Sequence, residues 1–262
     1  MGALKRDFTP EDLGSELEAN GIDTSIAVQT TQSEEENHFL LGLTAKFPRI
    51  AGVVGWVDLC DPRMEERLRF FSKFPKLRGF RHIVQAEPDD RFLLRPEFVR
   101  GVRQLGSFGY TYDILIYPRQ LPAAVEFVHL LPEQRFVVDH IAKPEIGAHR
   151  KDNWESYIRA MAANRNVYCK ISGMVTEADW KLWRPEDFQY YLDVVLDTFG
   201  PGRLLFGSDW PVCLLAASYR QVVQLVEDFV RSNCPARMED IFGANAARFY
   251  SLKVTNTHGP AA

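Results

Sequence analysis

Several features that mark other classes of protein are missing from this 262-residue sequence. It has only four cysteines, and none form a C-x-x-C pair, so neither a zinc knuckle nor a thiol redox motif is predicted. There is no run of about 18 apolar residues to span a membrane, and residues 1–10 lack the apolar core of a secretory signal. These absences predict a cytoplasmic protein with reduced thiols and no membrane partner.

Clustered positive charge is also missing. The formal net charge is −4 and no long basic run occurs, so we expect no nucleic-acid partner. The hydrophobic content of 46% is enough for a sizeable core. Because no Pro/Gly/Ser-rich linker interrupts the chain, we predict one domain over residues 1–252 and a polar, disordered tail over residues 253–262.

Short apolar segments alternate with longer amphipathic ones. The segments between the apolar runs have helical spacing, and within residues 32–47 we expect Phe39, Leu40, Leu43 and Phe47 to share one apolar face. Strand followed by helix, repeated, indicates parallel βαβ units. The predicted strands, rich in β-branched and aromatic residues, are 24–30, 50–59, 77–83, 111–117, 135–141, 167–173 and 203–210.

Two parallel architectures fit this alternation, an open doubly wound sheet and a (β/α)₈ barrel. No G-x-G-x-x-G loop follows the first strand, which argues against a dinucleotide-binding open sheet. Polar residues end many of the predicted strands, and in a barrel these ends converge on one mouth where the active site lies. We therefore predict a barrel. The polar strand-end residues are Gln29, Asp58, Arg81, His82, His140, Ser172 and Asp209.

His140 and Asp209 are the strongest catalytic candidates. Because side chains alternate along a strand, His140 is expected to face the same way as Val138. Asp209 is likewise expected to face the same way as Leu205. If both faces point into the barrel, the two side chains meet at its mouth, where they can hold a divalent metal or polarise a carbonyl and accept a water proton. The structural alternative is a hydrogen-bonded histidine and a helix-capping aspartate.

Lys170 is unusual because it lies in the middle of a predicted strand, on the same face as Ser172. A lysine is rarely buried without a partner, and Asp113 in another strand is the candidate. Lys170 is therefore either a cation beside the substrate carbonyl or half of a structural ion pair.

Arg81 and His82 end one predicted strand and must point to opposite faces, one toward the mouth and the other toward the helices. Together with Lys170, Gln29 and Ser172 they are the predicted substrate-binding residues. The alternative for Gln29 is a simple hydrogen bond at its strand end.

The stretches VDHIAKP (138–144) and FGSDWPVC (206–213) resemble the amidohydrolase superfamily, in particular its amidohydrolase-related group of sugar-lactone and pyrone-dicarboxylate lactonases. The likeness extends from about Asp7 to Leu252. It implies a (β/α)₈ barrel of the metal-dependent hydrolase type. It also implies that Asp209 activates the water, while His140 binds a divalent metal, zinc above all, or the lactone carbonyl in members that work without metal.

The sequence departs from that family at its start. Members open with a strand carrying His-x-His, but no His-x-His occurs here, and the chain begins at what looks like the first helix, 9–21. We therefore expect a barrel that lacks its first strand, with a gap between strands 24–30 and 203–210. A metal would be left with His140 and Asp209 as its ligands. As it stands, such a chain is expected to be marginally stable and nearly inactive.

The leading hypothesis is an enzyme that opens a small, polar sugar-type lactone such as fucono- or rhamnonolactone. Two alternatives stay open: a non-oxidative decarboxylase of the same superfamily, and a truncated or catalytically silent relative with a binding role. Release of acid rather than carbon dioxide would distinguish the lactonase from the decarboxylase. Metal analysis together with a panel of lactones would identify a silent relative. A homo-oligomer is also left open.

Overall fold

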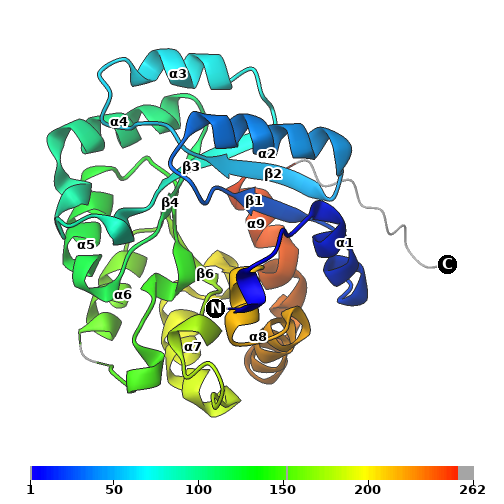
Figure 1. Ribbon diagram of the computed structural model, residues 1–262. Helices are drawn as coiled ribbons and strands as arrows, with labels where there is room; N and C mark the ends of the chain where they lie inside the picture. Colours follow the sequence, from blue (N-terminus) through cyan, green and yellow to red (C-terminus); the bar gives the residue numbers. More distant parts are fainter. Residues whose placement is uncertain (1, 152, 253–262) are drawn as a thin grey trace.

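Residues 2–151 and 153–252 are described by the computed structural model of the chain. Seven parallel strands form one sheet, and strands that follow one another in sequence are neighbours in the sheet (Figure 1). Parallel neighbours require crossover connections, and these contain the helices. The strands are β1 (Ser25–Val28), β2 (Ile50–Gly55), β3 (Leu77–His82), β4 (Thr111–Ile114), β5 (Phe136–Val138), β6 (Val167–Ile171) and β7 (Leu204–Phe206).

The main helices are one before β1, those between the strands and those that follow β7. They are α1 (Pro10–Ala19), α2 (Glu34–Lys46), α3 (Met64–Phe71), α4 (Pro96–Ser107), α5 (Leu121–Leu130), α6 (Trp154–Ala162), α7 (Pro185–Phe199), α8 (Tyr219–Asn233) and α9 (Asn245–Phe249). Short helical turns are η1 (Gly2–Leu4), η2 (Val84–Ala86), η3 (Phe92–Leu94), η4 (Pro118–Gln120), η5 (Asp139–Ala142), η6 (Ile146–Ala148), η7 (Val175–Glu177), η8 (Pro201–Arg203), η9 (Val212–Leu215), η10 (Pro235–Arg237) and η11 (Asp240–Ala244).

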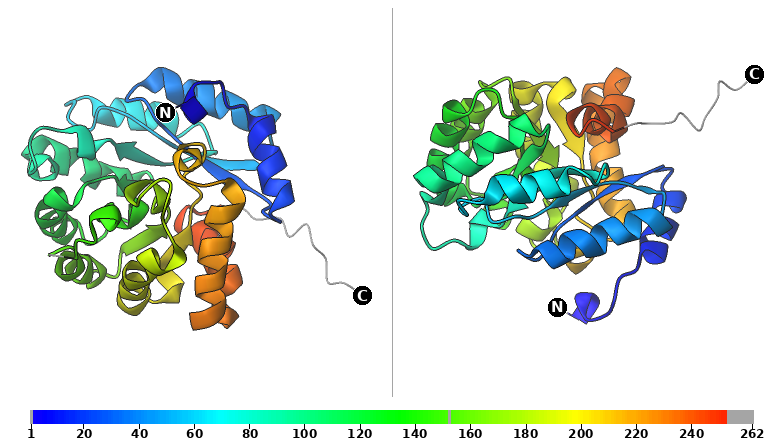
Figure 2. Two further views of the ribbon diagram at one scale, coloured as in Figure 1. Left: turned by 60° about the horizontal axis from the view of Figure 1, so that its bottom comes forward. Right: turned by 90° about the horizontal axis from the view of Figure 1, so that it is seen from above.

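The sheet is curled, with helices packed around its outer face (Figure 2). Residues such as Phe80 and Phe136 point outward and form the large core between sheet and helices. Val137 and Leu205 point inward and form a second core with Tyr250, from the end of the described chain. The alternation of side chains along each strand thus builds two cores, as in a barrel whose interior is filled.

The curl is open between its two end strands. In the described part of the chain, β1 pairs only with β2 and β7 only with β6. Leu17 of α1 packs with Tyr219 and Val223 of α8 in a third core, against which Phe206 of β7 also packs. Phe8 and Trp210 meet in a T-shaped contact with 5.3 Å between ring centroids. The seven parallel strands and the gap expected from the sequence are both found.

Two details of the sequence-based prediction were wrong. Each strand is shorter than predicted. In α2, Phe39 is 63% exposed, and the helix buries Asn37, Leu41 and Thr44 instead. The amide of Asn37 forms hydrogen bonds with both the backbone carbonyl (2.6 Å) and the backbone N–H (2.7 Å) of Trp56, so a polar residue fixes the rotation of this helix. Apolar periodicity alone could not reveal that contact.

No described helix is both long and apolar enough to cross a membrane. The four cysteines are free, and Cys169 is buried as expected. The tail predicted at 253–262 lies outside the described residues.

Candidate active site

His140 and Asp209 lie together at the carboxyl ends of the strands. His140 follows β5 and Asp209 follows β7. His140 Nε2 is 3.7 Å from Asp209 Oδ1, and the two side chains are 13% and 17% exposed. The structure thus brings this predicted pair together at a place that is partly open to solvent.

The backbone, rather than strand alternation, orients His140. Strand β5 ends at Val138, which points outward, so the expected common face of Val138 and His140 was wrong. His140 has φ 54° and ψ 39°, and the left-handed conformation continues through Lys143 (φ 50°). Asp209 also has φ 54°. Such conformations cost side-chain-bearing residues about 1–2 kcal/mol each, and strain of this kind gathers at functional sites.

Ser172 and Gly173, which follow β6, hold the imidazole of His140 in position. The Ser172 hydroxyl lies 2.9 Å from His140 Nδ1. Gly173 has φ +62°, and a Cβ there would lie 2.6 Å from the ring, so only glycine leaves space for the imidazole in this position. Burial lowers the pKa of His140, although Asp209 opposes this shift. Burial therefore favours the neutral form of the ring.

A network of buried charges lies beneath the pair. Lys170 Nζ is 2.6 Å from Asp113 and 2.6 Å from Asp139, and Arg81 is 2.8 Å from the other oxygen of Asp139. Burial opposes the charge on Lys170, but Asp113 and Asp139 raise its pKa. Burial likewise opposes the charge on Asp139, but Lys170 and Arg81 lower its pKa. The Tyr250 hydroxyl donates to Asp113 at 2.7 Å, which joins the end of the described chain to the network.

Of the other predicted site residues, Arg81 and His82 end β3 and Gln29 follows β1. Arg81 points into the curled sheet and donates to the carbonyl of Gln29, whose side chain donates back to the Arg81 carbonyl at 2.9 Å. His82 points outward, stacks on Phe92 at 4.7 Å between centroids and lies 2.7 Å from Glu87. The predicted opposition of Arg81 and His82 is found. The side chain of Gln29 makes the simple hydrogen bond that was its alternative.

Sequence reasoning missed three residues that shape this region. Asp139 is buried and joins Lys170 to Arg81; its place beside His140 in VDHIAKP was the available signal. Lys143 and Glu177 form an ion pair of 3.3 Å, and nothing in their spacing revealed it. Burial raises the pKa of Glu177, and the nearby charge of Asp209 adds to this effect.

The described residues do not supply a complete metal centre. Two ligands of a tetrahedral zinc ion lie about 3.3 Å apart, so the 3.7 Å between His140 and Asp209 would suit two of them. Protein zinc sites use three or four ligands. Nowhere in 2–151 and 153–252 do three or more His, Cys, Asp or Glu side chains gather closely enough to hold an ion, and Ser172 already contacts the other nitrogen of His140.

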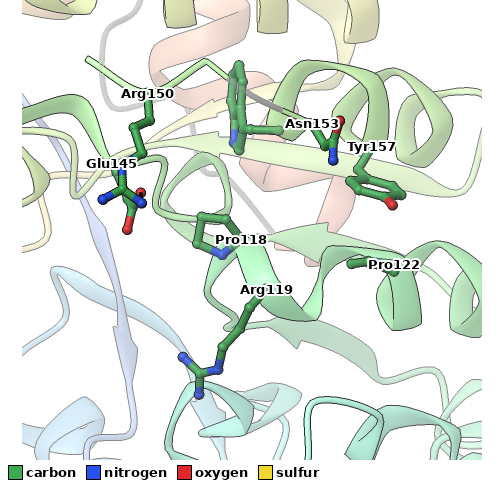
Figure 3. A pocket seen from close by; sticks show the side chains of 8 residues that line it. Pro118, Arg119, Pro122, Glu145, Arg150, Asn153 and Tyr157 are labelled. Carbon is green, nitrogen blue, oxygen red and sulfur yellow. Dashed lines mark ion pairs between the residues drawn. The ribbon is translucent and has the colours of Figure 1, made fainter. Parts of the chain in front are cut away.

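A surface pocket lies apart from the pair, between α5 and α6 (Figure 3). Its walls include Arg119, Glu145 and Arg150, of which the last two form an ion pair of 2.9 Å. None of the predicted site residues lines it. The remaining lining residues are Pro118, Pro122, Asn153, Trp154 and Tyr157.

Known proteins resemble this chain over nearly its whole described length. The family model described as Amidohydrolase matches residues 2–252. The chain belongs to this family. It is 43% identical to an L-fucono-1,5-lactonase of Burkholderia multivorans, over 96% of this chain and 88% of that one. It is 34% identical to an L-fucono-1,5-lactonase of Burkholderia ambifaria, over the same shares of each chain.

A solved structure extends the likeness to the fold. An amidohydrolase from Burkholderia multivorans with bound zinc superposes with a TM-score of 0.92 at 42% identity, covering 97% of this chain and 92% of that chain. The predicted superfamily and the barrel-type fold are thereby confirmed.

Proposed function

We propose that this amidohydrolase-family chain hydrolyses a small sugar-type lactone, an aldonolactone such as L-fucono-1,5-lactone. Asp209 is the general base, and His140 binds the lactone carbonyl. One observation carries the proposal: His140 and Asp209 face each other at the carboxyl ends of the strands, in a chain 43% identical to a protein named for that reaction.

Asp209 and His140 divide the first step between them. Asp209 takes a proton from water as the water oxygen bonds to the carbonyl carbon, and negative charge gathers on the carbonyl oxygen. An Nε2–H of neutral His140 donates to that oxygen. Only one nitrogen of a neutral imidazole carries a proton, so Nδ1 must then accept from the Ser172 hydroxyl, 2.9 Å away.

The second step opens the ring. The bond between the carbonyl carbon and the ring oxygen breaks, and the released alkoxide takes back the proton held by Asp209. Water and lactone thus become one hydroxy acid, and both residues return to their starting states. Every proton in this scheme is carried by described side chains.

The other predicted site residues act, we propose, mainly through His140. Ser172 is only 2% exposed, so it holds the imidazole, in place of the substrate contact expected from the sequence. Lys170 and Arg81 neutralise Asp139, the residue before His140. Substrate contacts of Lys170, Arg81, His82 and Gln29 remain predictions.

A divalent metal at His140 and Asp209 would need ligands beyond those that the described residues provide, so none of the steps above depends on one. With free cysteines and a net charge of −4, we propose a cytoplasmic enzyme for a small molecule, without nucleic-acid or membrane partners. A single domain and a homo-oligomeric state stay predictions.

The test is acid release from a panel of lactones by the wild type and by Asp209→Asn. An amide cannot accept the water proton, so the rate should fall by about 10²- to 10⁴-fold. Asp228→Asn, at an aspartate that is 58% exposed, is the matched control and should keep full activity. Near wild-type hydrolysis by folded Asp209→Asn would exclude this mechanism. Carbon dioxide release from aromatic acids without lactone hydrolysis would favour a decarboxylase. Binding of a lactone without turnover would favour a catalytically silent relative.

A further inference from the structure

We propose that the ion pair of Lys143 and Glu177 binds ring hydroxyls of the lactone and so selects polyhydroxylated lactones over bare ones. This inference rests on the function proposed above and assigns a specificity role to two residues outside the His140–Asp209 pair.

The ion pair lies at the same end of the sheet as the catalytic pair. Lys143 belongs to the left-handed turn after β5, and its backbone N–H donates to the carbonyl of His140 at 2.7 Å. Glu177 ends η7, which follows β6 and contacts η9, the turn just after Asp209. In the proposed complex, a ring whose carbonyl contacts His140 extends toward Lys143 and Glu177.

The ion pair is held in place and is still accessible. Its side chains are 16% and 21% exposed, whereas those of Lys170 and Asp113 are 12% and 0% exposed. Lys143 Nζ also lies 5.5 Å from the ring centroid of Tyr117, which follows β4. Within the described part of the chain, Lys143 makes no ion pair other than that with Glu177. Donors of the ammonium and an oxygen of the carboxylate are thus left for a ligand.

Such a pair matches adjacent hydroxyls. A hydroxyl can donate to the carboxylate of Glu177 while its neighbour accepts from the ammonium of Lys143. An unsubstituted lactone has a carbonyl for His140 but no hydroxyls for the ion pair. The Lys143–Glu177 pair should therefore affect only hydroxylated substrates, whereas His140 and Asp209 act on every lactone.

The kinetic test compares Lys143→Met and Glu177→Gln with the wild type on L-fucono-1,5-lactone and on δ-valerolactone. On the sugar lactone, kcat/KM should fall by about 10- to 150-fold for each variant, which is the usual effect of losing a hydrogen bond to a charged group. On δ-valerolactone it should stay within about twofold. Glu145→Gln, at a 52% exposed carboxylate on the same loop, is the control and should change neither value. Equal losses on both substrates, or no loss on either, would overturn the proposal.

A binding measurement separates this inference from the proposed function. Lactams keep the ring and resist hydrolysis, so the lactam of the sugar and the bare six-membered lactam can be titrated by calorimetry. The wild type should bind the sugar lactam more tightly, and both variants should lose about 10- to 150-fold in affinity for it alone. Wild-type enzyme that binds the two lactams equally would overturn the inference even if it hydrolyses lactones. Failure to hydrolyse any lactone would refute the proposed function instead.

Discussion

At His140 and Asp209 the backbone has φ 54°, so the orientation of both side chains depends on local constraint. For His140 that constraint includes Gly173, whose missing Cβ leaves room for the imidazole. Strained positions persist only where the surrounding structure holds them. A change at Gly173 should therefore affect catalysis out of proportion to its size.

Gly173→Ala should retain the fold and lower kcat/KM by about 10- to 100-fold, because a displaced imidazole no longer meets the carbonyl correctly. The matched control is Gly21→Ala. Gly21 has φ +65°, close to the +62° of Gly173, but a Cβ at Gly21 would point into open space. Both variants should lose about 1–2 kcal/mol of stability from conformation alone, and only Gly173→Ala should lose activity. Equal kinetics in both variants would contradict a positioning role for Gly173.

Lys170→Met tests whether Lys170 serves structure or substrate. It would leave Asp113 and Asp139 buried without their shared cation. We expect the free energy of unfolding to fall by about 3–5 kcal/mol, measured by denaturant titration. Lys181→Met, at an exposed lysine, should change little. A Lys170→Met protein of normal stability that has lost turnover would instead support the predicted substrate contact.

At the residue scale, the sequence predicted which residues form the site better than it predicted what each of them contacts. His140, Asp209, and the pairing of Lys170 with Asp113 were predicted from residue type and strand position, and the structure places each pair together. Asp139 was missed because the expected alternation of side chains along the strand placed His140 on the inward face, and therefore placed its neighbour Asp139 on the outward face. A left-handed turn of four non-glycine residues breaks that alternation, and no local sequence rule predicts it.

At the scale of elements, the strand–helix order was predictable because apolar runs and amphipathic segments differ in period. The rotation of α2 was not, since buried Asn37 bonds to the backbone after β2. The role of the last described element was also unforeseen. After α9, Tyr250 enters the interior of the sheet and donates to Asp113, although 137 residues separate the two in sequence.

Tyr250→Phe should lower the free energy of unfolding by about 1.5–3 kcal/mol, the usual value for a hydrogen bond to a charged group. The ring stays, so packing is preserved and the loss reports the hydroxyl. Tyr190→Phe is the control: it removes a hydroxyl that also donates to a carboxylate, Glu155, but at a partly exposed site where water can replace it. Equal losses in the two variants would mean that the buried contact contributes nothing beyond a surface one.

At the scale of the whole molecule, the described strands form an open curled sheet, and helices α1 and α8 pack together near its end strand β7. In the described part of the chain the edges of β1 and β7 do not pair with each other, and α1 packs on α8 in a core that also contacts Phe206 of β7. An unpaired edge is a template for association with another chain. The marginal stability and low activity expected from this gap stay predictions.

The pH dependence of stability is set in part by two buried histidines. Burial lowers the pKa of both His82 and His140 below the ordinary value of 6.5. Below that value the unfolded chain takes up protons that the folded chain excludes, so stability is lost as pH falls from 6.5 through the folded pKa values. Each histidine contributes a slope of at most about 1.4 kcal/mol per pH unit. The raised pKa values of Asp113 and Glu177 act in the opposite sense and reduce the net slope.

A difference between variants isolates the histidines, because the carboxylate contributions then cancel. The free energy of unfolding should be measured for wild type, His82→Asn, His140→Asn and His129→Asn between about pH 5 and about pH 7.5. Each of the first two variants should gain stability relative to wild type as pH falls, because it no longer holds a histidine whose protonation favours unfolding. His129 is exposed, so His129→Asn is the control for replacing a histidine by asparagine and should change the free energy of unfolding little. A constant difference between His140→Asn and the wild type across this range would mean that folding does not lower the pKa of His140.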